Sequence, residues 1–241
     1  MARIASFHLI SEPTWKAPLA LARLGLDRPR LARVGGLAFW RLMGTGRRDD
    51  TGPGADLRRT ALFAVWNDES DLDRFLDDHP ISRRWDSVGE AWHVRLRALG
   101  GHGRWRGFDP LDGMERGTQG GPIAVITRAD VRLSSSRDFG RAGKEVDAEL
   151  HTAAGLIDVV GVGEAPIGRL ATFSLWESMA DLREFAYRMP RHQQVVQETR
   201  DGDWYAEELF ARFEPYASAG AWNGRDPLAD RSSESGDTQA P

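Results

Sequence analysis

The residue types in this chain limit the metal chemistry that is open to it. It contains six histidines and no cysteine, which excludes thiolate zinc sites, iron-sulfur clusters and thiolate-ligated haem. Any metal must therefore bind to His, carboxylate or Tyr side chains. No two histidines lie three to five residues apart, so local two-His metal motifs are excluded as well.

An internal repeat indicates which histidine deserves most weight. Residues 61–80 (ALFAVWNDESDLDRFLDDHP) are nearly repeated at residues 171–190 (ATFSLWESMADLREFAYRMP), at an offset of 110. Common packing explains the shared positions, so chemistry is expected where the copies differ. The same offset places His192 opposite Ser82, and Pro190 favours a helix whose first turn would hold His192. His192 is then either a metal ligand or a solvated surface histidine.

A second difference lies in the strand predicted at residues 171–176. Its alternation places Ala171, Phe173 and Leu175 on one face and Thr172, Ser174 and Trp176 on the other. The two hydroxyl groups either bind a ligand or form local hydrogen bonds.

The elements that must position these residues occur twice. Each copy contains a β-rich opening, a helix, two strands, a second helix and a last strand, which is the β-α-β-β-α-β order of a ferredoxin-like unit. One such unit leaves a sheet face open, and the other copy can cover it. We predict an α+β fold in which two tandem ferredoxin-like halves, residues 1–115 and 120–228, pack sheet to sheet as an intramolecular α/β barrel. The polar residues 229–241 are predicted to be a disordered tail.

Charge and hydropathy limit the classes of binding partner that the chain is expected to have. The formal net charge is −4, which gives no reason to bind nucleic acid. No run approaches the 18 or more apolar residues of a spanning helix, and the first residues do not form a signal peptide, so we expect a cytoplasmic protein. Residues 14–47 are leucine-rich and basic, with Asp27 as the single acid. This segment predicts either a peripheral membrane contact or a packed helix with a solvated basic side.

At the level of whole segments, the chain resembles the spheroidene monooxygenase family of carotenoid ketolases. The resemblance spans nearly all of residues 4–228 in order. It is carried by the segments GLAFWRLMGTG, LFAVWNDE, GPIAVITRADVR, GVGEAP, ATFSLW, RHQQVVQETRDGDWYAEELFARF and GAWNGRDPL. It implies the dimeric α/β-barrel superfamily, a b-type haem, and insertion of oxygen into a long apolar polyene.

Carried over by position, the resemblance makes His192 the axial haem ligand. It makes Ser174 a candidate for a distal hydrogen bond to an iron-bound ligand. The predicted cofactor contacts also include Thr172, Trp176, Phe185 and Tyr205, the last of which stands where the family tends to have Phe.

The leading hypothesis is therefore a haem-dependent monooxygenase for a hydrophobic small molecule, supplied by a separate electron donor or by peroxide. The alternatives are haem-dependent dehydration of the aldoxime dehydratase type, a non-catalytic haem or lipophile binding protein, and a cofactor-free barrel monooxygenase. Two fused halves are compatible with a monomer, and outer helices could pair two chains as a homodimer.

Overall fold

A computed structural model describes residues 2–46, 55–118, 120–164, 169–188, 194, 199, 202 and 204–229. Of the predicted tail, all residues except Ala229 lie outside this set. The first half contains β1 (Ile4–Ser11), α1 (Ala17–Leu26), α2 (Arg28–Leu31), β2 (Leu37–Gly46), β3 (Ala55–Trp66), α3 (Glu69–Asp78), α4 (Pro80–Trp85) and β4 (Glu90–Gly103). The second half contains β5 (Ile123–Val131), α5 (Ser136–Leu150), β6 (Leu156–Gly163), β7 (Arg169–Trp176), α6 (Met179–Arg188) and β8 (Tyr205–Gly220). Short 3-10 turns at Thr14–Lys16 and Leu133–Ser135 precede α1 and α5.

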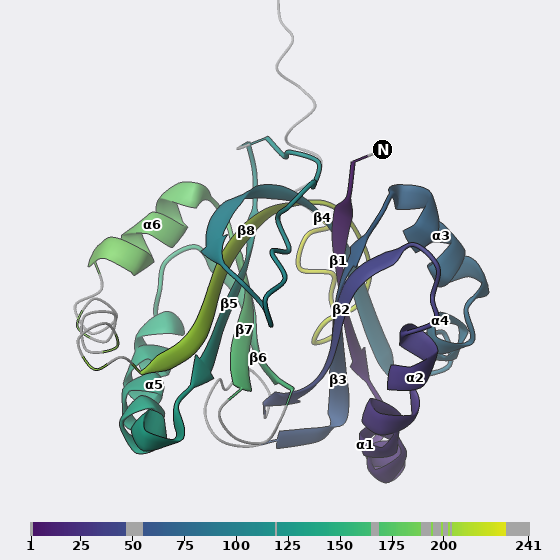
Figure 1. Ribbon diagram of the computed structural model, residues 1–241, viewed down its shortest axis with the longest axis horizontal. Helices are drawn as coiled ribbons and strands as arrows, with labels where there is room; N and C mark the ends of the chain where they lie inside the picture. The colour runs from purple at the N-terminus through teal and green to yellow at the C-terminus, as the bar shows by residue number, and fades with distance from the viewer. Residues whose placement is uncertain are drawn as a thin grey trace, which may run out of the picture.

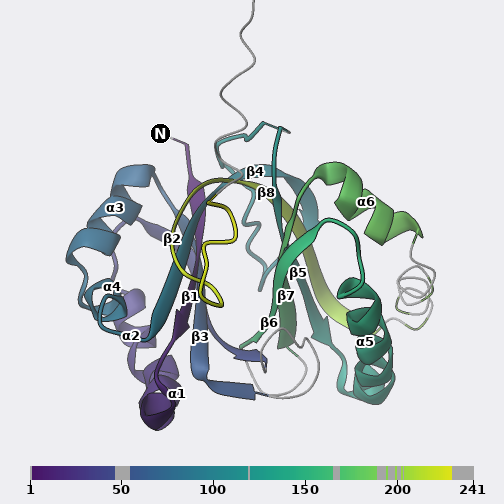
Figure 2. The ribbon, with the colours of Figure 1, turned by 180° about the vertical axis from the view of Figure 1, so that it is seen from behind.

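The strands form one closed antiparallel barrel in the order β1-β3-β2-β6-β7-β5-β8-β4. Each half contributes a four-stranded sheet. A long pairing of β4 with β8, from Trp92–Gly220 to Gly103–Leu209, joins the sheets on one side, and a short pairing of β2 with β6 joins them on the other. Helices α1–α4 cover one side of the barrel and α5 and α6 the opposite side (Figures 1 and 2). The predicted barrel of two ferredoxin-like halves is confirmed.

The interior of the barrel is a packed apolar core. Strand alternation sends every second side chain inward, and these residues include aromatic rings from both halves. Phe7 of β1 stacks on Phe173 of β7 with ring centroids 3.9 Å apart, and Trp92 lies 5.3 Å from Trp222. Because these rings are buried completely, the two halves are held together by direct side-chain packing.

Two matching turns contribute a tryptophan each to this core. Residues 105–111 (WRGFDPL) and 222–228 (WNGRDPL) follow β4 and β8. The indole Nε1 of Trp105 donates a 2.6 Å hydrogen bond to the buried carboxylate of Glu164, whereas the Nε1 of Trp222 is buried without a partner. The repeat therefore preserves the turn and changes what its tryptophan contacts.

Local capping determines where the equivalent helices α3 and α6 begin. The Asp68 carboxylate accepts a hydrogen bond from the backbone N–H of Asp71 at 3.0 Å, and the Ser178 hydroxyl accepts one from Asp181 at 3.2 Å. Both satisfy an N–H that the first helical turn leaves free.

Among the described residues, no helix has the length and apolar character needed to cross a membrane.

Candidate functional site

The hydroxyl-bearing face of β7 points away from the barrel interior. Ala171, Phe173 and Leu175 belong to the barrel core, so Thr172, Ser174 and Trp176 face the helical layer of the second half. The predicted alternation of this strand is confirmed. Any ligand bound by these hydroxyls would lie between the second-half sheet and its helices.

Ser174 has a local hydrogen bond within this layer. Its hydroxyl oxygen accepts a bond from the indole Nε1 of Trp176 at 3.0 Å, and both side chains are buried. In the first half, the equivalent indole finds its acceptor on another strand. Trp66 donates a hydrogen bond to the Ser6 hydroxyl of β1 at 2.8 Å. Ser6 pairs with Ala64, which stands where Ser174 stands in the repeat. The serine acceptor therefore lies on the neighbouring strand in the first half and on the tryptophan's own strand in the second. In both halves the indole N–H donates to a serine hydroxyl.

The remaining predicted residues lie in different surroundings. Phe185 of α6 contacts Trp176 with ring centroids 5.2 Å apart, as part of the core beneath α6. Tyr205 lies at the start of β8 opposite Val131, four residues along β5 from Thr127, which is about 13 Å at the usual strand rise. Burial raises the pKa of Tyr205 to about 12, helped by the charge of Glu208, so its phenol stays protonated at neutral pH. His192 lies outside the described residues.

In the first half, the middle of the outer sheet face is covered. Leu62, His8 and His93 sit side by side on β3, β1 and β4. The ring of Trp85 in α4 lies 5.0 Å from that of His8 and 5.3 Å from that of His93. His8 is 1% exposed as a result.

The two histidines of this row are neutral. Their Nδ1 atoms lie 2.9 Å apart, which requires one of them to carry no proton, and His8 Nε2 lies 2.8 Å from the Ser6 hydroxyl. Burial holds the pKa of His8 well below its ordinary value, with the nearby His93 and Arg95 adding to the effect. Burial also lowers the pKa of His93 to about 4.

Within the described residues, the equivalent row of the second half is open. Thr172, Thr127 and Phe210 sit side by side on β7, β5 and β8. Thr127 is exposed although its strand pairs on both sides, and its two neighbours are only partly buried. The described residues of the second half thus leave accessible a surface that Trp85 and two imidazoles fill in the first half. Two hydroxyl groups and an aromatic ring form its floor.

A cation for which the described residues offer no carboxylate partner lies beside this floor. Arg95 of β4 and Arg212 of β8 occupy equivalent positions, paired with Ser6 and Val125 respectively. Arg95 binds two carboxylates of α3, Glu69 at 2.9 Å and Asp73 at 2.6 Å.

At the offset of 110, Met179 and Arg183 replace these two acids in α6. Arg212 accordingly contacts the Met179 sulfur at 3.8 Å, and its Nε is buried without a hydrogen-bond partner. A partly buried guanidinium of this kind favours an anionic ligand.

Sequence reasoning missed Thr127, Phe210 and Arg212. The repeat contained a signal for Arg212, because the acids of residues 69 and 73 are absent at residues 179 and 183. That signal becomes useful only when Arg95 is known to reach α3.

Comparison with known proteins finds three relatives named spheroidene monooxygenase. It is 34% identical to the spheroidene monooxygenase of Rubrivivax gelatinosus over 79% of this chain and 73% of that protein. The chain belongs to the spheroidene monooxygenase family. It is 27% identical to the Rhodobacter capsulatus member over 95% of this chain and 96% of that protein. The Cereibacter sphaeroides member is 29% identical over 80% of this chain, which spans 60% of that longer protein. No family profile matches the chain.

Solved structures show the same fold for this spheroidene monooxygenase family member. A crystal structure of aldoxime dehydratase superposes with a TM-score of 0.60 at 10% identity, covering 95% of this chain and 86% of that one. A second, of aldoxime dehydratase in complex with butyraldoxime, gives 0.60 at 12% identity over 89% and 79%. At this identity the likeness concerns the barrel alone. Membership of the family supports a monooxygenase on this barrel.

Histidine and carboxylate groups do not gather into a metal site within the described residues of this family member, where no cluster of three or more is found.

Proposed function

We propose that this chain is a haem-dependent monooxygenase that acts on a hydrophobic small molecule, a carotenoid-like polyene or another lipophilic metabolite. The observation that carries the proposal is the open outer face of the second-half sheet beside Arg212. Trp85 covers the equivalent face of the first half, whereas the described residues of the second half leave Thr127 exposed. The relatives' name, spheroidene monooxygenase, supports the reaction and the substrate class.

The residues present fit a haem. Its propionates are anions that require a cation, and Arg212 is a partly buried guanidinium with an unsatisfied Nε and no described carboxylate partner. Its faces are apolar and require an uncharged floor, which Thr127, Thr172 and Phe210 provide. With no cysteine in the chain, a thiolate ligand is excluded, and we propose His192 as the ligand of the iron because haem commonly takes an axial His.

When bound, haem would supply the activation of oxygen or peroxide, with electrons from a separate donor in the oxygen case. The chain's own residues would bind and orient. Arg212 neutralises the propionate charge, the floor excludes water, and Ser174 presents a hydroxyl whose oxygen is already held by Trp176. The uncharged floor favours an apolar substrate over a charged one.

The first experiment is the visible absorption spectrum of the protein and of His192→Ala, each expressed with a haem precursor. A Soret band that is lost or shifted in the variant supports the ligand assignment. A strong unchanged band would remove His192 as the ligand and leave haem in place. A colourless wild-type protein that takes up no added haem would refute the proposal in favour of a cofactor-free barrel.

Arg212→Met tests the proposed contact of Arg212 with the haem propionates. Arg95→Met is the matched control because Arg95 occupies the equivalent position of the first half. We expect Arg212→Met to speed the transfer of haem to apomyoglobin while the Soret maximum stays in place. Arg95→Met should transfer haem at the wild-type rate. Equal rates for the two variants would exclude Arg212 as a haem contact.

A reciprocal variant tests the same contact without removing the arginine. Met179→Glu with Arg183→Asp gives Arg212 the two carboxylates that Arg95 has. Those acids should occupy the guanidinium and weaken haem binding, while the haem-free protein becomes more stable. Unchanged haem affinity in this variant would count against the assignment.

Turnover then separates the remaining functions. Product formation that needs oxygen or peroxide supports the monooxygenase. Oxygen-independent dehydration of an aldoxime would point to the dehydratase alternative, and haem binding without turnover to a binding protein.

A further inference from the structure

The helix α1 carries an unusual apolar surface. Six large hydrophobic side chains are exposed in the described chain, and four of them lie between residues 15 and 26. They are Trp15 at 77% exposure, Leu26 at 61%, Leu21 at 51% and Leu19 at 43%, and we name them the α1 surface. Single exposed hydrophobic residues are ordinary on a protein surface, whereas several close together mark an interaction site.

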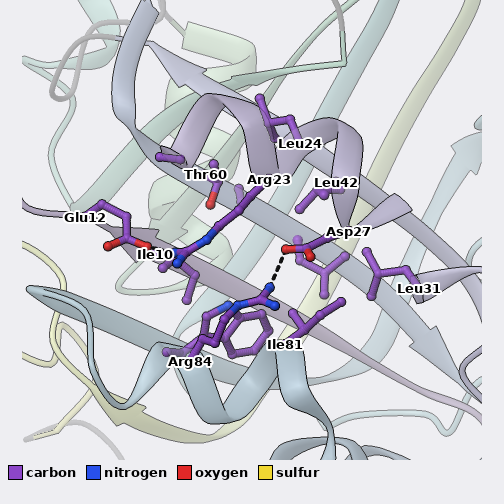
Figure 3. A pocket seen from close by; sticks show the side chains of 14 residues that line it. Ile10, Glu12, Arg23, Leu24, Asp27, Leu31, Leu42, Thr60, Ile81 and Arg84 are labelled. Atoms are coloured by element: carbon purple, nitrogen blue, oxygen red, sulfur yellow. Dashed lines mark hydrogen bonds and ion pairs between the residues drawn. The ribbon is translucent and has the colours of Figure 1, made fainter. Parts of the chain in front are cut away.

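The helix also differs from an ordinary surface helix, which hides most of its apolar side chains. Only Ala20 is buried within α1. Beside Ala20 and the partly buried Leu24, the inward side presents charge, because Arg23 forms an ion pair with the buried Glu12. At the end of the helix, the buried Asp27 binds Arg84 of α4 at 2.5 Å (Figure 3).

These inner ion pairs hold α1 in this orientation. A cavity of about 30 Å³, room for one water molecule, lies among the charged groups and the strands beneath (Figure 3). The layer is therefore nearly filled, and the leucines of the outer side cannot turn inward without breaking two buried ion pairs. The outward apolar face is a stable feature of the fold.

Positive charge accompanies the α1 surface. The Lys16 ammonium lies 4.9 Å from the centroid of the Trp15 ring, and Arg33 is exposed just beyond α2. The Arg30 side chain is 54% exposed. Asp27, the single acid of residues 14–47, is buried and already paired. An apolar face edged by cations matches an anionic lipid surface in both chemistry and charge.

The repeat shows that the barrel does not require this surface. The helix at the equivalent place in the second half, α5, has the sequence SRDFGRAGKEVDAEL, with four acids and three bases among its fifteen residues. Both helices follow the first strand of their half and lie on the outside of the barrel (Figures 1 and 2). By sequence, α1 contains four leucines, whereas the longer α5 contains one.

We propose that the α1 surface docks on an anionic lipid bilayer, with Trp15 and the three leucines at the level of the acyl boundary and the cations at the headgroups. In Figures 1 and 2, α1 projects at the lower edge of the molecule, where a flat surface can approach it. This inference does not depend on haem.

Vesicle sedimentation tests the docking. The full chain is mixed with vesicles of phosphatidylcholine alone or of an equimolar mixture with phosphatidylglycerol. We expect binding to the anionic vesicles, and a loss of about tenfold or more in partition for Leu19→Gln with Leu26→Gln. Lys16→Gln with Arg33→Gln should reduce the preference for anionic over neutral vesicles. The matched control is Tyr187→Gln. Tyr187 is 72% exposed and lies in the other half of the chain, so this variant should bind like the wild type.

Two further measurements test whether the variants stay folded and whether Trp15 reaches the acyl chains. Thermal unfolding should be unchanged in the leucine variants, since these side chains are exposed. Lipids brominated on the acyl chain should quench less fluorescence in Trp15→Phe than in the wild type.

The proposal would be overturned if the wild-type protein sedimented with neither kind of vesicle. A dimer in sedimentation velocity that the leucine variants convert to monomer while vesicle binding stays the same would also overturn it, because a second copy would then cover the α1 surface.

Discussion

Removing the Ser174 hydroxyl separates a structural role of this side chain from a role at a bound cofactor. In Ser174→Ala the indole N–H of Trp176 stays buried and loses its acceptor. Leaving a buried donor unsatisfied costs about 1–3 kcal/mol. For a chain of 241 residues, this corresponds to a fall in Tm of about 2–12 °C.

The first half supplies the compensating variant. Ser6, which serves Trp66, occupies the position of Val125 in the repeat. Val125→Ser with Ser174→Ala should therefore return a hydroxyl to the Trp176 indole from the neighbouring strand. Val125→Ser alone destabilises the protein, because it removes buried methyl groups, so the four proteins must be compared as a double-mutant cycle.

Urea denaturation followed by circular dichroism measures the cycle. We expect the double variant to be more stable than the sum of the single changes by about 1 kcal/mol, the net value of one hydrogen bond. Additivity of the two changes would refute the reasoning that the hydroxyl serves the indole. If stability is restored while the spectrum of the haem-loaded protein stays altered, Ser174 also acts at the cofactor. If both are restored, its role is structural.

Three other perturbations follow from the described contacts. The free energy of unfolding should fall as the pH drops from about 6.5 towards 4, because unfolded histidines take up protons that the buried His93, with its pKa of about 4, excludes. Urea titrations at stepped pH measure this, and His93→Gln should flatten the slope. Glu164→Ala strips the Trp105 indole and two guanidinium groups of their acceptor and should cost about 3–5 kcal/mol in urea denaturation, more than Glu164→Gln. Gly220→Ala, whose Cβ would lie 2.0 Å from a carbonyl oxygen of the facing strand, should lower the Tm clearly more than Gly224→Ala, which has a similar backbone but open space.

The repeat predicts most of the fold because its periodicity is local. Apolar alternation at residues 61–66 and 171–176 and helical spacing after them reflect how each segment buries one face. The structure places β3, α3, β7 and α6 there. Closure into a barrel follows from two sheets that each need a cover, and the pairing of β4 with β8 confirms it.

The site was only partly predictable, for a geometric reason. Alternation indicates that Thr172 and Ser174 share a face, and they do. It cannot indicate that Thr127 and Phe210, about 45 and 38 residues away in the chain, complete the same row, because register between distant strands is decided by packing. For Arg212, the decisive fact is what its counterpart Arg95 binds, which is a contact between a strand and a helix. The axial role of His192 remains a prediction.

For α1, composition predicted a basic, leucine-rich helix and left open which side faces water. Tertiary structure decided this through Glu12 and Asp27, two buried carboxylates that draw Arg23 and Arg84 inward and leave the leucines outside. Sequence by itself therefore determined the elements, their repetition and the family, because these depend on residue type and spacing along the chain. Tertiary structure alone decided which face of the second-half sheet the described residues leave open and which side of α1 exposes its leucines, because both depend on the pairing of charges and rings between segments that only folding brings together.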